Sequence, residues 1–262
     1  MMKILTTCGL TLALMLGSAS ANESAMKELA PTGKLRVGLV FAPSKSLFFN
    51  VKEGETAHGV TADLAAAFAK KLGVPVEQVL FPNSGLATDA LEAGRIDVSF
   101  MPIDDDRKKR IAFGPSYVIA ESTYMVTAAS GAKTAADVDR PGMRVIGIAG
   151  TATIRLVTRT LKNTTITPVT SVDDAVAAMR DGKADAFALG RDSLPPYIRQ
   201  VPGSRMTDGA FHHLPIAIAV AKDRPAALAY VTEFMNEAKK AGVVRRAIDK
   251  AGFDDPVAPP TQ

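Results

Sequence analysis

Residues 91–117 read LEAGRIDVSFMPIDDDRKKRIAFGPSY. The first part has the pattern of a helix that stops at Gly94, followed by a turn and a short buried strand over 96–101. Asp97 interrupts the apolar run of that strand, and Pro102 ends it. A strand placed between two helical segments is typical of α/β proteins, so we expect that fold class.

The second part of this stretch combines an acidic helix start with an arginine. Asp104, Asp105 and Asp106 offer N-cap oxygens and favourable charge to a new helix, which carries Arg107 in its first turn. A guanidinium beside outward-pointing backbone N–H groups is a good anion site, because its planar fork binds a carboxylate by two parallel hydrogen bonds. Arg107 could also pair with the three aspartates on a solvated surface, and the local sequence leaves both interpretations open.

The order of these features resembles family 3 of the bacterial extracytoplasmic solute-binding proteins, which serve ABC importers of amino acids. It runs helix, Gly, basic residue, Ile-Asp, strand, acidic cap and Arg107, with Phe-Gly-Pro-Ser-Tyr at 113–117 similar to an FSxPY-like stretch of that family. The resemblance extends from about Lys34 to Phe253. It implies that Arg107 holds the α-carboxylate of the ligand.

The resemblance also implies a type II periplasmic-binding-protein-like fold, in which two α/β lobes, each a sheet flanked by helices, are joined by two crossover strands. The sequence agrees with alternating strands and helices: strands are expected at 34–41 and 76–81, and helices at 64–72 and 86–93. Such alternation indicates parallel β-α-β units with ligands at the carboxyl ends of strands. Arg107 lies just beyond such an end.

A similar strand-to-helix turn occurs later in the chain. The predicted strand 144–148 is followed by Gly150 and Thr151, which would free backbone N–H groups and a hydroxyl for an anion. By itself this pattern is more often an ordinary N-cap. In the family, the same turn of the second lobe closes on the carboxylate held by the arginine, so the resemblance makes Gly150 and Thr151 candidate ligand-binding residues.

A sequence pattern that occurs twice in the chain supports two lobes of similar construction. Segments 91–98 and 179–186 both run from a helix through Gly, a basic residue, a small or apolar residue and Asp into a strand. The resemblance places the two crossings between lobes near 124–127 and 217–220. The predicted division is a signal peptide over 1–21, lobe 1 over 22–124, lobe 2 over 125–218, and a return to lobe 1 over 219–262.

Two departures from the family bear on the ligand. Gly190 stands where an amino-acid binder usually has an Asp for the α-ammonium group, and Pro102 stands where it usually has Ser or Thr. An unpaired ammonium group in a closed cleft would be costly. Either Asp192 or an aspartate of the 104–106 run replaces the missing partner, or the ligand lacks an α-amino group and is an organic acid or a doubly anionic molecule, for which Arg191 would be a second clamp. Arg191 could also be a solvated loop charge.

Other residues carry weaker signals. Phe41, with Phe48 and Phe49, is a candidate apolar wall for the ligand, although core packing would also explain these aromatics. The adjacent pair His212-His213 lacks a nearby third ligand, so we expect no metal site. No nucleotide-binding or hydrolase motif occurs, and we expect no cofactor.

The first residues predict export. Lys3, a mostly apolar run over 4–17 and Ala19-Ser20-Ala21 have the form of a signal peptide cleaved after Ala21, which implies a periplasmic protein. Cys8, the only cysteine, lies inside this segment, so no disulfide is expected.

The formal charge of +4 comes without a basic stripe or interleaved aromatic residues, so nucleic-acid binding is not expected.

We therefore expect the periplasmic substrate-binding component of an ABC importer, which captures a small carboxylate-bearing solute, an amino acid or a related organic acid, between two closing lobes. It would act as a monomer, without enzymatic activity, and deliver the solute to an inner-membrane permease. The alternatives are a periplasmic enzyme like cyclohexadienyl dehydratase, or a sensory subunit that presents the ligand to a receptor.

Overall fold

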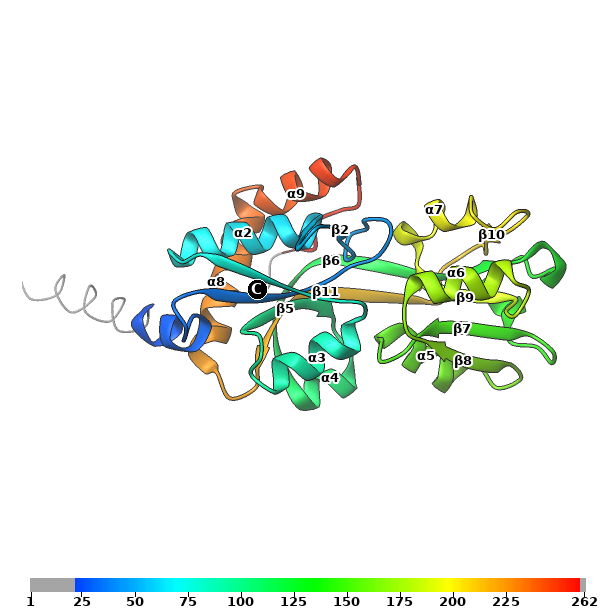
Figure 1. Ribbon diagram of the computed structural model, residues 1–262, viewed down its shortest axis with the longest axis horizontal. Coiled ribbons are helices and arrows are strands. Elements are labelled where there is room, and N and C mark those ends of the chain that lie inside the picture. Colours follow the sequence, from blue (N-terminus) through cyan, green and yellow to red (C-terminus); the bar gives the residue numbers. More distant parts are fainter. Residues whose placement is uncertain (1–21, 260–262) are drawn as a thin grey trace, which may run out of the picture.

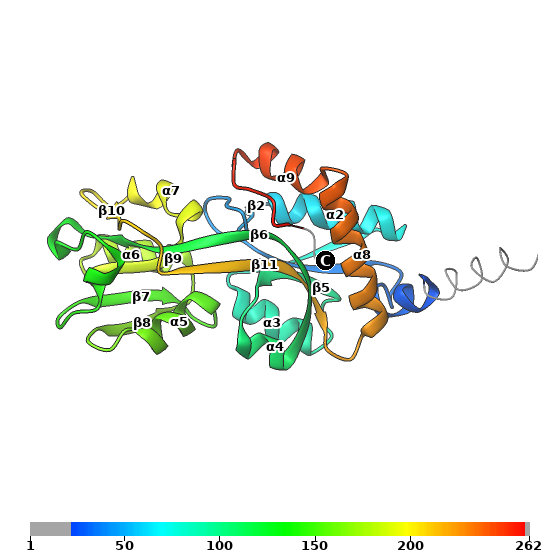
Figure 2. The same cartoon turned by 180° about the vertical axis from the view of Figure 1, so that it is seen from behind.

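The computed structural model describes residues 22–259, so the predicted signal peptide over 1–21 lies outside the described residues. The molecule is elongated and has two parts, each with its own helices, joined by the long strands β6 (Ile111–Val126) and β11 (His212–Ala221) (Figure 1). The view from behind shows the same two connections (Figure 2). We call the part that holds β1 lobe 1 and the part that holds β7 lobe 2.

One sheet runs through both lobes in the order β4-β1-β5-β11-β6-β9-β7-β8, with β10 paired to β6. Its other strands are β1 Leu35–Val40, β4 Val76–Phe81, β5 Val98–Pro102, β7 Arg144–Ile148, β8 Thr165–Val169, β9 Ala186–Gly190 and β10 Arg205–Met206. β1 pairs in parallel with β4 and β5, and β7 pairs in parallel with β8 and β9. Each lobe is thus a parallel unit completed by the antiparallel connecting strands, as the alternating sequence pattern indicated.

Helices cover both lobes. They include α2 Val60–Leu72, α3 Ser84–Glu92, α4 Asp105–Arg110, α8 Pro225–Lys240 and α9 Val243–Ala251 in lobe 1, and α5 Ala152–Thr160, α6 Val172–Arg180 and α7 Pro195–Ile198 in lobe 2. Short 3-10 turns lie at Ala128–Ser130, Ala135–Val138 and Arg191–Ser193. The helix ends follow capping rules: Gly94 and Gly182 both have φ of 67°, a left-handed conformation that glycine adopts without a Cβ clash.

The connecting strands change partner along their length. β6 pairs with β11 over Ile111–Ser122 and with β9 of lobe 2 over Ser122–Val126, whereas Ile216–Val220 of β11 pair with β5 of lobe 1. Of the two runs expected to cross between the lobes, 124–127 therefore lies largely in lobe 2 and 217–220 lies in lobe 1. We infer that β6 and β11 each cross between the lobes a few residues before these runs. The predicted division at 124/125 and 218/219 stays a prediction.

Three apolar clusters form the interior. One lies in lobe 1, around Leu35, Phe68 and Val231, and a smaller one lies in lobe 2, around Tyr124 and Val157. The remaining cluster is continuous across both lobes: it joins residues such as Val40, Ile96 and Phe49 to residues such as Ile146, Phe187 and Leu189. The two lobes thus bury apolar surface against each other.

The helix expected at 64–72 begins earlier, at Val60. Before it lie β2 (Val51–Glu53) and β3 (Thr56–His58), which pair in a two-stranded sheet that was not expected from the sequence. Near the C-terminal end, the amide of Ala258 donates a hydrogen bond to the carbonyl of Tyr117 at 2.9 Å. The tail residues that the structure describes therefore pack on lobe 1.

Candidate functional site

Arg107 lies in the first turn of α4, directly after the end of β5. Asp104 caps this helix: its Oδ1 accepts hydrogen bonds from the amides of Asp106 (3.0 Å) and Arg107 (3.1 Å). Arg107 is only 2% exposed, although α4 is a short and highly charged helix. The alternative that Arg107 is a solvated surface charge is therefore wrong.

Protein oxygens surround the guanidinium of Arg107. Nε donates to Thr88 Oγ1 (3.1 Å), and Nη1 donates to the carbonyl of Pro102 (2.9 Å). Nη2 donates to Ser84 Oγ (2.6 Å) and to the carbonyl of Gly150 (3.2 Å). Because Gly150 belongs to lobe 2 and the other acceptors belong to lobe 1, Arg107 lies at the seam where the lobes meet.

The charge of Arg107 is only partly compensated. Its closest carboxylate is that of Asp104, with Nη1 and Oδ2 3.6 Å apart, and Asp104 also forms an ion pair with Arg155 of lobe 2. Burial lowers the pKa of Arg107 to about 9, with Asp104 opposing the shift. The guanidinium is still charged at neutral pH, so a buried positive charge remains that a bound anion would stabilise.

Two glycines determine how closely the lobes approach beside Arg107. A Cβ added to Gly85, at the start of α3, would lie 2.9 Å from the Cα of Gly150, and a Cβ on Gly150 would meet Gly85 at the same distance. Gly150 also has φ of 68°, which L side chains rarely adopt. Both positions therefore need glycine for this contact to form.

Ion pairs reinforce the seam on its outer side. Arg155, on α5, forms an ion pair with Asp104 and lies 3.5 Å from the Asp106 carboxylate, and Arg159 lies 3.6 Å from the same carboxylate. Arg155 Nη1 also donates to the carbonyl of Gly150 at 3.0 Å. The acidic start of α4 is thus matched by arginines of the other lobe.

Further hydrogen bonds connect the lobes on the other side of the seam. Asp192 Oδ2 accepts from the amide of Leu47 (2.7 Å), and the Tyr197 hydroxyl accepts from the amide of Ser44 (3.2 Å). Both amides belong to the loop that follows β1. This loop also receives a hydrogen bond from lobe 1, where the Tyr117 hydroxyl donates to the carbonyl of Leu47 (2.7 Å).

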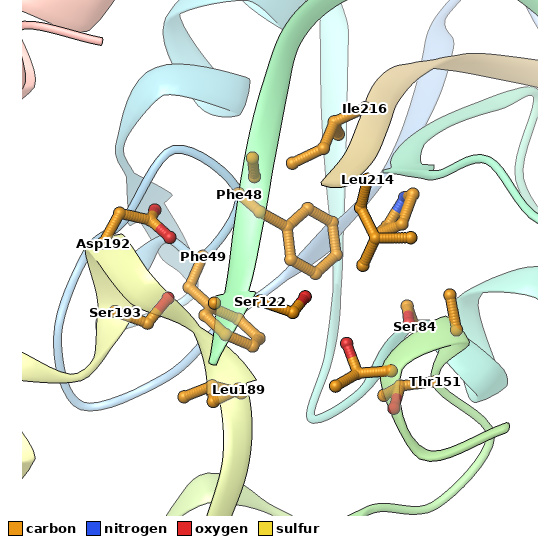
Figure 3. Close-up of a pocket in the computed structure, with 15 residues that line it drawn as sticks. Phe48, Phe49, Ser84, Ser122, Thr151, Leu189, Asp192, Ser193, Leu214 and Ile216 are labelled. Carbon is orange, nitrogen blue, oxygen red and sulfur yellow. The ribbon is translucent and has the colours of Figure 1, made fainter. Parts of the chain in front are cut away.

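A cavity of about 50 Å³, with space for a few water molecules, lies between the lobes. Figure 3 shows Ser84 and Thr151 on one side of it and Asp192 and Ser193 on the other, with Phe48, Phe49 and Ser122 between them. Residues of both lobes and both connecting strands line it: Phe48, Phe49, Ser84, Pro102, Ala120, Ser122, Thr151, Ala152, Thr153, Leu189, Gly190, Asp192, Ser193, Leu214 and Ile216.

The first turn of α5 forms the lobe 2 wall near Arg107. Thr151 is its N-cap: the hydroxyl accepts from the amide of Ile154 (3.2 Å) and donates to the carbonyl of Ile148 (2.8 Å). The N-cap expectation from the sequence is therefore confirmed. Ala152 and Thr153 also line the cavity, and amides in a first helical turn have no acceptor within their own helix.

Asp192 contributes the only formally charged side chain among the residues that line this cavity. Part of its surface is accessible, but desolvation of the carboxylate raises its pKa to about 6, partly offset by the hydrogen bond from Leu47. Its position depends on Gly190, because a Cβ at Gly190 would lie 2.7 Å from Asp192 Oδ1. The carboxylate of Asp192 thus occupies the space that a side chain at 190 would need.

The residues singled out from the sequence fall into three groups. Thr151 and Asp192 line the cavity; Arg107 and Gly150 lie at the seam next to it, joined by a hydrogen bond. Arg191 is absent from the lining: its Nε donates to Glu121 (2.8 Å), and its Nη2 donates to the carbonyl of Gly209 (2.6 Å).

Phe41 is also absent from the lining of this cavity. It is half-buried, and the Nζ of Lys52 lies 5.9 Å from the centre of its ring. Phe48 and Phe49, the other two aromatics considered for the apolar wall, do line the cavity, with ring centres 5.0 Å apart.

Sequence reasoning missed several lining residues. Ser84 follows the carboxyl end of β4, a position where ligand contacts are common in parallel sheets, so its place was predictable in principle. Ser122, Leu214 and Ile216 come from β6 and β11, and no motif marks them.

Within residues 22–259, no group of three or more His, Cys, Asp or Glu side chains could hold a metal ion. No helix in the same range is long and apolar enough to cross a membrane.

Comparisons with known proteins agree with the architecture. The model of the family "Bacterial extracellular solute-binding proteins, family 3" matches residues 40–253. A glutamine-binding protein of Geobacillus stearothermophilus is 25% identical over 213 residues, which cover 78% of this chain and 79% of that protein.

Solved structures show the same fold. A mutant of ArgBP from T. maritima superposes with a TM-score of 0.75 and 27% identity, covering 86% of this chain and 98% of that one. An ancestral amino acid-binding protein, described as a precursor of cyclohexadienyl dehydratase, superposes with a TM-score of 0.73 and 28% identity. The match covers 86% of this chain and 98% of that one. The expected type II two-lobe α/β fold is therefore confirmed.

Proposed function

We propose a function from one premise: the chain belongs to family 3 of the bacterial extracellular solute-binding proteins. Its relatives include proteins named for amino acids, such as the glutamine-binding protein and a probable histidine-binding protein of Campylobacter jejuni. The protein is then the periplasmic binding component of an ABC importer for a small carboxylate-bearing solute. It is exported by the signal over 1–21, acts as a monomer, and delivers the solute to an inner-membrane permease.

The observation that carries this proposal is the buried Arg107 at the seam. Its guanidinium is 2% exposed, and its nearest carboxylate lies 3.6 Å away and is shared with Arg155. Keeping a cation in such a place is costly unless an anion binds there. The carbonyl of Gly150, which accepts from Nη2 at 3.2 Å, occupies an oxygen position that a ligand carboxylate would take.

The neighbouring groups suit a carboxylate. Ser84 lines the cavity, and its hydroxyl accepts a hydrogen bond from Arg107. Because the guanidinium polarises this hydroxyl, its O–H group can donate a stronger hydrogen bond to a bound anion. The first turn of α5 supplies backbone N–H groups and the positive end of a nine-residue helix at Thr151–Thr153. Lobe 1 thus provides the cation, and lobe 2 provides the amides.

Closure follows from this division of contacts. A ligand that first docks against Arg107 meets the α5 amides only after lobe 2 has moved onto it, so the closed state gains contacts that the open state lacks. The ion pair between Arg155 and Asp104 and the hydrogen bond that the amide of Leu47 donates to Asp192 also stabilise the closed state. β6 and β11 form the hinge, because they pair with each other between the lobes, while β11 also pairs with β5 of lobe 1 and β6 also pairs with β9 of lobe 2.

Arg107→Gln tests the proposal, with Arg110→Gln as a matched control on the same helix. Arg110 is exposed and pairs with Asp89 and Glu92, so the control removes the same charge without touching the seam. Ligands found by a thermal-shift screen of amino acids, their deaminated analogues and dicarboxylates are then titrated by calorimetry. We expect Arg107→Gln to lose about thirtyfold or more in affinity, and Arg110→Gln to lose almost none.

Unchanged affinity in folded Arg107→Gln, verified by circular dichroism, would refute the role of Arg107. A ligand-induced decrease in the radius of gyration, measured by small-angle X-ray scattering, tests closure separately. The comparisons do not favour the dehydratase-like enzyme or the sensory subunit, and we propose neither.

A further inference from the structure

The cavity separates two opposite charges. On one side are Ser84, bound to the buried Arg107, and Thr151; on the other side is Asp192 (Figure 3). Neither charge is fully compensated by the protein. Arg107 has only the shared carboxylate of Asp104 at 3.6 Å, and within residues 22–259 Asp192 is held by hydrogen bonds from neutral groups, with no ion pair.

The wall between the two charged sides is largely apolar. Phe48 and Phe49 stand between them, Leu189 lies on the lobe 2 side, and Leu214 and Ile216 of β11 face the cavity from the hinge (Figure 3). A third charged group on the ligand would lose its hydration here without gaining a partner, which is unfavourable. The site therefore accommodates one negative end, one positive end and an apolar middle.

Asp192 is built to face the cavity. Its Oδ2 is occupied by the amide of Leu47 at 2.7 Å, whereas Oδ1 lies over the backbone of Gly190, which also lines the cavity. A side chain at 190 would displace this oxygen, since its Cβ would come within 2.7 Å of Oδ1. Gly190 thus leaves room for the carboxylate to stand at this side of the cavity.

We propose that the ligand is a small linear zwitterion whose ammonium group and carboxylate are separated by a short apolar chain, as in an ω-amino acid. Its carboxylate binds beside Ser84 and Arg107, and its ammonium group binds Asp192. This inference rests on the proposed function and narrows it. An α-amino acid carries its two charges on one carbon and reaches only one side, a basic amino acid brings a second cation, and a dicarboxylate places an anion against Asp192.

Isomers provide the test. We expect 4-aminobutanoate or 5-aminopentanoate to bind the purified full-length mature protein at neutral pH at least about tenfold more tightly than 2-aminobutanoate, butanoate or pentanedioate. Calorimetry gives the affinities, and the ligand-induced rise in melting temperature gives an independent readout.

Two variants locate the ammonium site. Asp192→Asn keeps an acceptor for the amide of Leu47 and removes the charge, so it should weaken ω-amino acid binding at least about tenfold while leaving butanoate binding unchanged. Gly190→Ala keeps the carboxylate but pushes it aside, and should show the same selective loss. Asp181→Asn, at an exposed position in lobe 2, is the control and should change neither affinity.

The outcomes separate this inference from its premise. If 2-aminobutanoate or butanoate binds as tightly as its ω-amino counterpart, or if Asp192→Asn weakens all carboxylates equally, the zwitterion assignment is wrong and the solute-binding function stands. If no carboxylate in the panel binds, the proposed function fails and this inference fails with it.

Discussion

Each lobe contains the same arginine–aspartate clamp, and the two clamps differ in burial. In lobe 1 the amide and Nε of Arg36 donate to Asp97 Oδ2 (2.9 and 3.0 Å), and Nη2 donates to Oδ1 (2.7 Å). In lobe 2 Arg144 makes the same three bonds to Asp185, at 2.9, 2.9 and 2.7 Å. Each aspartate amide in turn donates to its arginine's carbonyl at 2.8 Å.

The surroundings differ. The Asp97 side chain is 0% exposed and Arg36 is 20% exposed, against 17% for Asp185 and 47% for Arg144. A second arginine, Arg224 from the loop before α8, lies 3.7 Å from Asp97. The repeated motif therefore produces the same local geometry twice, but the returning C-terminal segment covers only the clamp of lobe 1. Removing the carboxylate should reveal how much that cover contributes.

The largest effect is expected for Asp97→Asn. This change leaves Arg36 partly buried opposite a neutral amide, and breaking a buried ion pair costs about 3–5 kcal/mol. The free energy of unfolding should fall by that amount in urea titrations at neutral pH. A loss below about 1 kcal/mol would show that burial adds little to the stability of the Arg36–Asp97 pair, and would contradict the proposed difference between the two lobes.

Asp192→Asn is expected to act in the opposite direction, because this carboxylate has no arginine partner. Its pKa is raised to about 6 from the ordinary 3.8, so the folded state binds a proton more readily than the unfolded state. The free energy of unfolding that depends on Asp192 therefore decreases as pH rises from about 4 to about 6 and stays lower above it.

The ligand-free Asp192→Asn protein should gain about 1–2 kcal/mol at neutral pH, or a few degrees in melting temperature, and lose this advantage near pH 4. Melting curves over that pH range provide the measurement. A destabilised variant at neutral pH would mean that the hydrogen bond from the Leu47 amide to the Asp192 carboxylate stabilises the folded state by more than desolvation of this carboxylate destabilises it.

Asp185→Asn should cost about 1 kcal/mol, less than its lobe 1 counterpart, because solvent screens the exposed Arg144. The hydrogen bond from Arg144 lowers the pKa of Asp185. Its contribution is therefore present above the unfolded-state pKa and is lost as pH falls through the lowered folded-state pKa. The difference in free energy of unfolding between wild type and variant should shrink in acid. Equal costs for Asp97→Asn and Asp185→Asn would contradict the effect of burial.

The smallest effect is expected for Arg159→Gln at the outer seam. Arg159 is 54% exposed and lies 3.6 Å from Asp106, which is 44% exposed. Exposed pairs of this kind contribute little because solvent and salt screen them, so the free energy of unfolding should stay within the error of the measurement and any difference should vanish in high salt. A loss as large as that expected for Asp185→Asn would show that the seam is held by surface charge.

Several elements were predictable because their signals are local. The strands at 76–81 and 144–148 follow from apolar periodicity, and the structure has them at those residues. The N-cap roles of Asp104 and Thr151 followed from capping rules. The hairpin of β2 and β3 was missed because three-residue strands carry too little periodicity.

The site was only partly predictable because its walls come from distant parts of the chain. Thr151 and Asp192 were identified from motif positions, and both line the cavity. Leu214 and Ile216 sit in an ordinary apolar strand, and nothing local distinguishes the side chains that face the cavity from those in the core. Arg191 shows the reverse: its loop position suggested a clamp, but Glu121, seventy residues away in the chain, binds it.

The sequence by itself determined the alternating α/β pattern, the repeated Gly-basic-x-Asp motif and the cap that orients Arg107, because each depends on neighbours a few residues apart. Only the tertiary structure decided that Arg107 is buried, that Gly85 and Gly150 meet, and that Asp97 is covered while Asp185 is not. Burial, and with it the strength of every charge in the site, depends on which distant segments pack over a residue, and local patterns do not encode that.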